Sequence, residues 1–276
     1  MSTDGPSTDE QASAPPGIDV SVPSIARVYD YVLGGKDNFA SDRAASQAFL
    51  DMMPETPLLA RDNRDFLRRA VRWLVAEAGI RQIVDIGSGL PTAGNVHEIA
   101  REAADDVRVV YVDVDPIVLA HGRALLADDV DTTVIQADVR DPDAIFSDPA
   151  TRALIDLSQP VAVLVSSLLH HLADDERPED VAAALTARLV SGSYLLVANF
   201  FDPEDDARAP RVEKAFLEGG LGTGRFRTRA EQEPYFAGLE MVEPGLVFAN
   251  DWRPDGSSPR ESPVHRLYVG GIGRKP

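Results

Sequence analysis

The stretch IVDIGSGLP, residues 83–91, decides the fold of this chain. An apolar run meets two closely spaced glycines, which is typical of a buried strand that turns sharply into a helix. Gly87 allows the tight turn, and Gly89 lets the main chain approach a ligand where a side chain would collide. Pro91 has a fixed φ and no N–H, so we expect it at the first position of the helix. The stretch predicts a doubly wound α/β fold.

A glycine turn of this kind also occurs between a strand and a helix that bind no ligand, so its context matters. Three more strands are predicted downstream, and a small or acidic polar residue follows each. They are 108–112 followed by Asp113, 133–137 followed by Asp138, and 161–165 followed by Ser166. Asp113 lies 24 positions after Gly89, close to the spacing at which these folds hold ribose hydroxyls. Polar residues at successive strand ends indicate a ligand site.

The composition is that of an ordinary globular protein. Of 276 residues, 44% are hydrophobic and 26% charged. The absence of cysteine excludes thiol nucleophiles, disulfides and thiolate metal sites, and we expect no metal. A formal net charge of −18 disfavours a nucleic-acid partner. No apolar run is long enough to cross a membrane and no signal-peptide pattern occurs, so we expect a cytoplasmic protein without a membrane partner.

We expect three parts along the chain. Residues 1–22 lack apolar periodicity and should form a disordered tail. Residues 23–79 should form a helical arm, and residues 80–276 the sheet domain. Because ligands of such folds bind at the carboxyl ends of the strands, the arm is placed to cross that opening as a lid.

The last two predicted strands, 241–248 and 264–269, have no helix between them. They imply an antiparallel hairpin that closes the sheet. With a further strand at 194–198, the sequence predicts a Rossmann-like sheet of seven strands, mostly parallel, with helices between them.

This order of elements resembles the class I S-adenosylmethionine-dependent methyltransferases. Their motif Asp/Glu-x-Gly-x-Gly-x-Gly is matched at Asp85, Gly87 and Gly89, with Pro91 in the last place. More narrowly, three blocks resemble one methyltransferase family formerly catalogued as a domain of unknown function. They are PSIARVYDYVLGGKDNFASDR at 23–43, DIGSGLPTAGNVHE at 85–98 and YVDVDPIVLAHGRALL at 111–126. The resemblance implies S-adenosylmethionine as cofactor and leaves the methyl acceptor open.

The resemblance also implies which residues hold the cofactor. Asp113 would accept hydrogen bonds from the ribose hydroxyls, and Asp138 would meet the adenine. Lys36, on the arm, is a candidate partner for the cofactor carboxylate, although it also fits a solvated loop charge. The full predicted set is Tyr29, Gly35, Lys36, Asn38, Asp85, Gly87, Ser88, Gly89, Asp113, Val114, Asp138, Val139 and Ser166.

Methyl transfer from a sulfonium needs no acid to protonate the leaving group, so the protein mainly has to align the acceptor with the methyl group. A base is needed only if the acceptor carries a proton, and His170 or His171 is then the first candidate. Packing or capping is the alternative role of these two residues. A small molecule is the expected acceptor, with a protein next. The sequence leaves the oligomeric state open.

Two other functions stay open. An NAD(P)-dependent oxidoreductase needs a pyrophosphate cradle, but Thr92 replaces the third glycine of that motif and Pro91 removes an N–H donor. No Tyr-x-x-x-Lys pair occurs either. The other alternative is a non-catalytic protein that binds S-adenosylmethionine.

Overall fold

The computed structural model describes residues 18–91, 94–256 and 262–276. Most of the predicted disordered tail and Thr92 lie outside the described residues. The prediction of disorder was wrong for 18–22, because Ile18 and Val20 are buried against α6 (Pro116–Leu125). Two alternating apolar residues are too short a pattern to predict an ordered segment from sequence.

The centre of the fold is a mixed sheet of eight strands. Their order is β3-β2-β1-β4-β5-β8-β6, and β7 also pairs with β8. Strands β1 to β5 are parallel, and β8 runs antiparallel to β5, β6 and β7. The strands are β1 Gln82–Ile86, β2 Arg108–Asp113, β3 Thr132–Gln136, β4 Ala162–Ser166, β5 Tyr194–Phe200, β6 Glu240–Met241, β7 Val247–Phe248 and β8 Tyr268–Arg274. The predicted fold class and the antiparallel closure are confirmed.

The predicted number of seven strands was wrong because one expected strand is divided. Residues 241–248 form two short strands around a turn, in which the Gly245 N–H donates to the Val242 carbonyl at 2.8 Å. Gly245 has φ +91°, a left-handed conformation that suits a turn and interrupts a strand.

The final strand also lies further along the chain than the predicted 264–269. The prediction missed the later part of this strand because residues 270, 271 and 273 are glycines, and glycine lowers strand propensity. The structure explains why residue 270 is a glycine, because a Cβ at this position would lie 2.5 Å from the ring of Phe66. Glycine therefore lets β8 lie directly under α4 (Thr56–Ala76).

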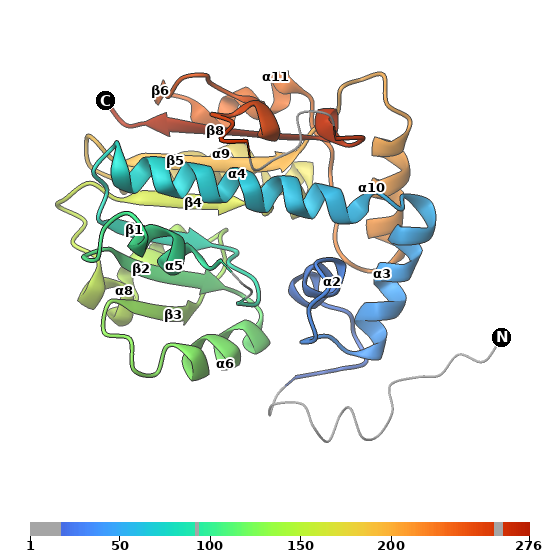
Figure 1. Ribbon diagram of the computed structural model, residues 1–276, viewed down its shortest axis with the longest axis horizontal. Coiled ribbons are helices and arrows are strands. Elements are labelled where there is room, and N and C mark those ends of the chain that lie inside the picture. Colours follow the sequence, from blue (N-terminus) through green and yellow to red (C-terminus); the bar gives the residue numbers. More distant parts are fainter. Residues whose placement is uncertain (1–17, 92–93, 257–261) are drawn as a thin grey trace.

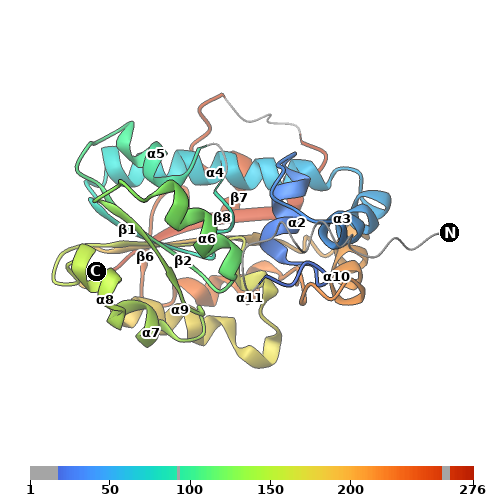
Figure 2. The same ribbon diagram turned by 90° about the horizontal axis from the view of Figure 1, so that it is seen from below.

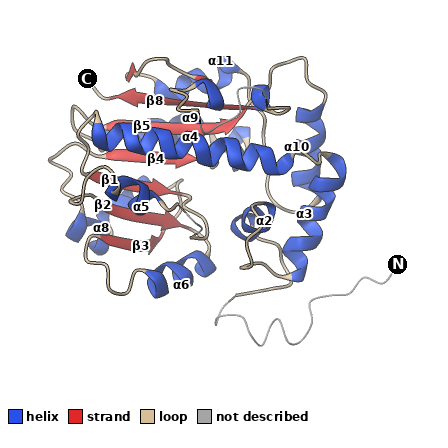
Figure 3. Ribbon diagram, in the orientation of Figure 1, coloured by secondary structure: helices blue, strands red, loops and turns tan. Residues whose placement is uncertain are grey.

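Helices cover both faces of the sheet (Figures 1 and 3). Figure 2 shows α4 and α5 on one face and α7, α8 and α9 on the other. The remaining bounds are α2 Ile25–Val32, α3 Ala40–Met52, α5 Val96–Arg101, α7 Pro142–Ser147, α8 Pro149–Leu154, α9 Pro178–Ala187, α10 Arg208–Glu218 and α11 Arg229–Gln232. No helix in the described ranges combines the length and apolar character needed to cross a bilayer.

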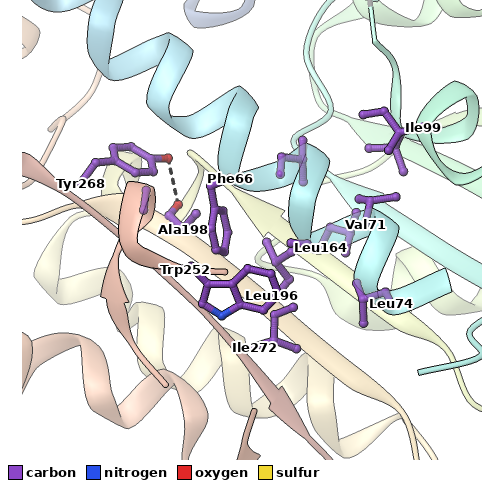
Figure 4. Close-up of a cluster of buried hydrophobic side chains, with 14 of the residues drawn as sticks. Phe66, Val71, Leu74, Ile99, Leu164, Leu196, Ala198, Trp252, Tyr268 and Ile272 are labelled. Atoms are coloured by element: carbon purple, nitrogen blue, oxygen red, sulfur yellow. Dashed lines mark hydrogen bonds between the residues drawn. The ribbon is translucent and has the colours of Figure 1, made fainter. Parts of the chain in front are cut away.

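The core beneath α4 fixes this helix along the sheet. Phe66 and Leu74 are fully buried at intervals that place them on one face of the helix. The ring of Phe66 meets Trp252 edge-on with centroids 5.5 Å apart, as Figure 4 shows. In the same figure Tyr268 donates to the Ala198 carbonyl at 3.2 Å. Although the prediction counted α4 with the arm, it packs as part of the sheet domain.

Helices α2 and α3 lie beyond the edge of the sheet. In Figure 1 they lie with α10 past the carboxyl ends of the parallel strands. The rings of Phe49 on α3 and Phe216 on α10 have centroids 4.5 Å apart. The edge of the sheet is therefore enclosed by elements from both ends of the chain.

Candidate active site

A cavity of about 630 Å³ lies at the carboxyl edge of the sheet. Its walls come from the glycine loop, the tips of β2 and β4, and the helices α2, α4 and α10. Most of the residues predicted from sequence meet there. They are Tyr29, Asp85, Gly87, Ser88, Gly89, Asp113, Val114, Asp138, Val139, Ser166, His170 and His171.

The glycine loop presents backbone to this cavity. Gly87 and Gly89 have φ +71° and +67°, values that side chains rarely adopt. A Cβ on Gly89 would meet no atom within 4 Å, so the main chain there borders open space. The prediction of a helix start at Pro91 was wrong, because α5 begins at Val96. Its start is set by Asn95, whose N–H donates to the Glu98 carboxylate at 2.7 Å.

Asp113 ties the loop to the second strand. Its carboxylate accepts from the N–H groups of Gly89 and Asp115, each at 2.9 Å. Burial raises its pKa, and the two backbone donors oppose that rise. Each carboxylate oxygen has two lone pairs, so both keep capacity for a further donor such as a ribose hydroxyl.

Two opposite charges face the cavity beside this loop. Asp85 is 6% exposed, and burial raises the pKa of its carboxyl to about 7, with a further contribution from Asp113. Arg64 on α4 attracts this carboxylate and opposes the rise. In the part of the chain that the structure describes, Asp85 has no hydrogen-bond donor and Arg64 has no carboxylate within 4 Å. Both can therefore bind groups of a ligand.

Asn63 was missed from sequence but connects the arm to the fourth strand. The Ser166 hydroxyl donates to Oδ1 of Asn63 at 2.7 Å, and Nδ2 of Asn63 donates to the Tyr29 hydroxyl at 3.0 Å. Tyr29 in turn donates to the Ala60 carbonyl at 3.2 Å. Asn63 lies on the inner stripe of α4, one turn before the fully buried Phe66. A polar residue in an apolar stripe is the signal that could have predicted it.

Asp138 is already paired. Arg140 holds both of its carboxylate oxygens and also binds Glu176 at 2.6 Å. The hydrogen bonds from Arg140 lower the pKa of Asp138. Next to it, Val114 is 60% exposed, an apolar side chain open to the cavity.

Gly35, Lys36 and Asn38 do not line the cavity. Asn38 donates to the Asp30 carboxylate at 3.0 Å, and a Cβ on Gly35 would overlap that same carboxylate. Lys36 is exposed to solvent. These residues build the turn after α2, a local role that accounts for their pattern without a ligand.

Both histidines occupy a short 3-10 turn, Leu169–His171. The ring of His170 stacks on Phe200 at 3.9 Å, and its Nδ1 accepts from the Phe200 N–H at 3.4 Å. Burial lowers the pKa of both imidazoles, that of His171 to about 4, so they are neutral near pH 7. Arg227 donates to the carbonyls of Leu169 and Leu172 and fixes this turn.

Among residues 18–91, 94–256 and 262–276, no group of three or more histidine, aspartate or glutamate side chains is arranged to hold a metal ion.

Comparison with known proteins gives the same site a family context. The model of the family described as S-adenosyl methyltransferase matches residues 11–276. The chain is 46% identical to a candidate methyltransferase from Thermobifida fusca YX of known crystal structure, with TM-score 0.90 over 95% of this chain and 98% of that one. It is 39% identical to a DUF574 family protein from Streptomyces avermitilis MA-4680, with TM-score 0.89 over 94% and 99% of the two chains. Among curated proteins none matches.

More distant structures share the fold alone. Human N-acetylserotonin methyltransferase, solved in complex with S-adenosylmethionine, is 14% identical with TM-score 0.50, over 90% of this chain and 62% of that one.

Proposed function

The chain belongs to the S-adenosyl methyltransferase family, and we propose that its acceptor is a small molecule bound in the cavity at the carboxyl edge of the sheet. The family gives the enzyme class and the cofactor, S-adenosylmethionine. The observation that carries the proposal is the cavity itself, in which a polar glycine loop and an enclosed apolar wall share one space.

The residues of the cavity fit S-adenosylmethionine. Its methionine part carries both an ammonium and a carboxylate, and the cavity offers a carboxylate on Asp85 and a guanidinium on Arg64 that face no close partner of opposite charge. We assign Asp85 to the ammonium and Arg64 to the carboxylate. Arg64 takes the role that the sequence had suggested for Lys36, which lies outside the cavity wall.

The adenosyl part is assigned to the strand tips. Asp113 would bind the ribose hydroxyls with the lone pairs that the loop leaves free. The exposed Val114 would cover a face of the adenine, and the Val139 main chain its edge. Asp138 would approach the adenine while it remains paired with Arg140.

When bound, S-adenosylmethionine supplies an electrophilic methyl group on a sulfonium. The protein has to align the acceptor with that methyl group and exclude water. Enclosure by α2, α3 and α10 serves the exclusion, and the Ser166–Asn63–Tyr29 hydrogen bonds hold the arm against β4.

The oxidoreductase alternative gains no support. A dinucleotide pyrophosphate binds at a free helix N-terminus. Here the first N–H of the α5 cap is taken by Glu98, and the loop before it is flanked by the carboxylates of Asp85 and Asp113.

Thermal stability with S-adenosylhomocysteine, compared with NAD, tests the proposal. A ligand at 100 times its Kd stabilises by about 2.7 kcal/mol. That corresponds to about 5–10 °C in Tm for a domain near this size. An increase in Tm with NAD and no increase with S-adenosylhomocysteine would refute the assignment of S-adenosylmethionine as cofactor.

Asp113→Ala should weaken S-adenosylhomocysteine binding by about tenfold or more, because hydrogen bonds to a charged group are lost. Asp105→Ala, an exposed residue at the turn before β2, is the control and should bind normally. Equal affinity of the two variants in calorimetry would show that the ribose contact is misassigned.

A further inference from the structure

One part of the cavity is not used by the residues assigned to the cofactor. This part, which we call the acceptor compartment, is bordered by α2, α3, α10 and the ends of β5 and β8. Its walls include Val28, Phe49, Val212, Phe216, Phe200 and Tyr268.

Aromatic rings form a continuous surface in this compartment. The Phe216 centroid lies 4.5 Å from that of Phe49, 5.5 Å from that of His171 and 5.8 Å from that of Phe200. Phe200 stacks on His170 with the planes 11° apart. Ring faces and edges in this arrangement favour a planar aromatic ligand, which can stack or meet them edge-on.

The compartment offers no counter-ion. The charged side chains that line the cavity come from the segment before α2, from α2 and α4, from the glycine loop and strand tips, and from the turn near Glu176. In the described ranges, α3, α10, β5 and β8 contribute none to the wall. Arg27, on α2, is already paired with the buried Asp42 at 2.8 Å. A charged acceptor here would lose its hydration without compensation, so the compartment selects an uncharged one.

One imidazole on the aromatic wall has no hydrogen-bond partner in the described part of the chain. His171 lines the cavity and is only partly buried, and neither of its ring nitrogens forms a hydrogen bond with any described residue. Nδ1 of His170, in contrast, already accepts from the Phe200 backbone. Because a polar group without a partner in an apolar wall is unfavourable, the imidazole of His171 suits a ligand group that can donate a hydrogen bond. Near pH 7 the imidazole is neutral, so one of its nitrogens can accept a hydrogen bond.

We propose, resting on the function proposed above, that the methyl acceptor is an uncharged planar aromatic molecule whose hydroxyl group donates to His171. Methyl transfer then forms the O–CH3 bond as the C–S bond breaks. The sulfur keeps the electron pair of that bond, and the hydroxyl proton goes to the imidazole of His171. The product is a methyl ether that carries no charge.

Four probes with one ring system separate the features of this proposal. They are 2-naphthol, naphthalene, 2-naphthoate and 2-naphthylmethylamine, which are respectively hydroxylated, bare, anionic and cationic near pH 7. Binding to the full chain saturated with S-adenosylhomocysteine is measured by calorimetry or thermal shift. We expect 2-naphthol to bind about tenfold or more tightly than the other three.

Two variants and a matched control locate the site. Phe216→Leu keeps an apolar side chain but removes the ring, so 2-naphthol binding should fall about tenfold. Leu217→Ala changes the neighbouring residue on α10, which is 63% exposed, and should leave binding unchanged. His171→Phe keeps a ring but removes the nitrogen, so 2-naphthol should bind no better than naphthalene does. All three should bind S-adenosylhomocysteine as the unmodified protein does.

The outcomes separate this inference from the function on which it rests. If S-adenosylhomocysteine does not bind, the proposed function itself fails. If it binds, the inference is overturned when the anionic or cationic probe binds as well as 2-naphthol, when no ring compound binds, or when His171→Phe retains the preference for the hydroxyl. Formation of 2-methoxynaphthalene by the unmodified protein and its loss in His171→Phe would support the proton transfer. A ring-methylated product would contradict it.

Discussion

Replacing Asp85 with asparagine should stabilise the protein without ligand at alkaline pH. Asp85 is buried and has no hydrogen-bond donor in the described part of the chain. Its pKa is raised from 3.8 to about 7, chiefly by burial. Between these values the folded state holds a proton that the unfolded state has released. The contribution of Asp85 to stability is therefore present at low pH and is lost as pH rises through about 7.

The magnitude follows from the size of the increase. Each pKa unit corresponds to about 1.4 kcal/mol, so an increase of this size amounts to about 4 kcal/mol. Water that enters the cavity reduces this value, which is therefore an upper limit. Asparagine at position 85 carries no charge at any pH. Part of this difference is already present at pH 5, so the stability of Asp85→Asn relative to the unmodified protein should rise by up to about 2.7 kcal/mol from pH 5 to pH 8, or roughly 5–11 °C in Tm.

Thermal unfolding of both proteins at pH 5, 6, 7 and 8 measures this difference. Subtracting one Tm from the other removes the titration of the other carboxylates, and Asp105→Asn serves as an exposed control. With S-adenosylhomocysteine at pH 8, the unmodified protein should have the higher Tm of the two, because the ammonium of the ligand pairs with the ionised Asp85. A constant difference in Tm across the series would refute the argument from burial. A difference that depends on pH, with unchanged ligand affinity, would refute only the ammonium contact.

Two further predictions follow from the packing and charge of single residues. Arg64→Leu should weaken S-adenosylhomocysteine about tenfold while leaving adenosine, which has no carboxylate, unaffected, and calorimetry with both ligands would expose an error if both affinities fell equally. Gly270→Ala should destabilise by about 1–3 kcal/mol in urea unfolding, because its Cβ would lie 2.5 Å from the Phe66 ring; an unchanged midpoint would mean that α4 shifts freely.

The local patterns of the chain predicted most of the elements. The apolar run before Gly87 and the acidic residue at the end of β2 are features of neighbouring residues, and their spacing placed β1, β2 and the glycine loop correctly. The bounds of elements were predicted wrongly where glycine or proline interrupts the periodic pattern. The predicted last strand stopped before the glycines of β8, and Pro91 was assigned to a helix start, because the residues that pack near them in space cannot be read from the sequence.

The sequence by itself therefore determined the order of strands and helices and the backbone of the cofactor loop, since hydrophobic periodicity and glycine spacing act over a few residues. The tertiary structure decided which side chains share the cavity. Ser166 and Asn63 bond across 103 positions, Arg64 reaches the site from α4, and Lys36 faces solvent although its neighbours fit a ligand-binding segment. Such contacts depend on how α2, α4 and α10 pack at the end of the sheet, and side-chain packing between distant segments leaves no periodic trace along the chain.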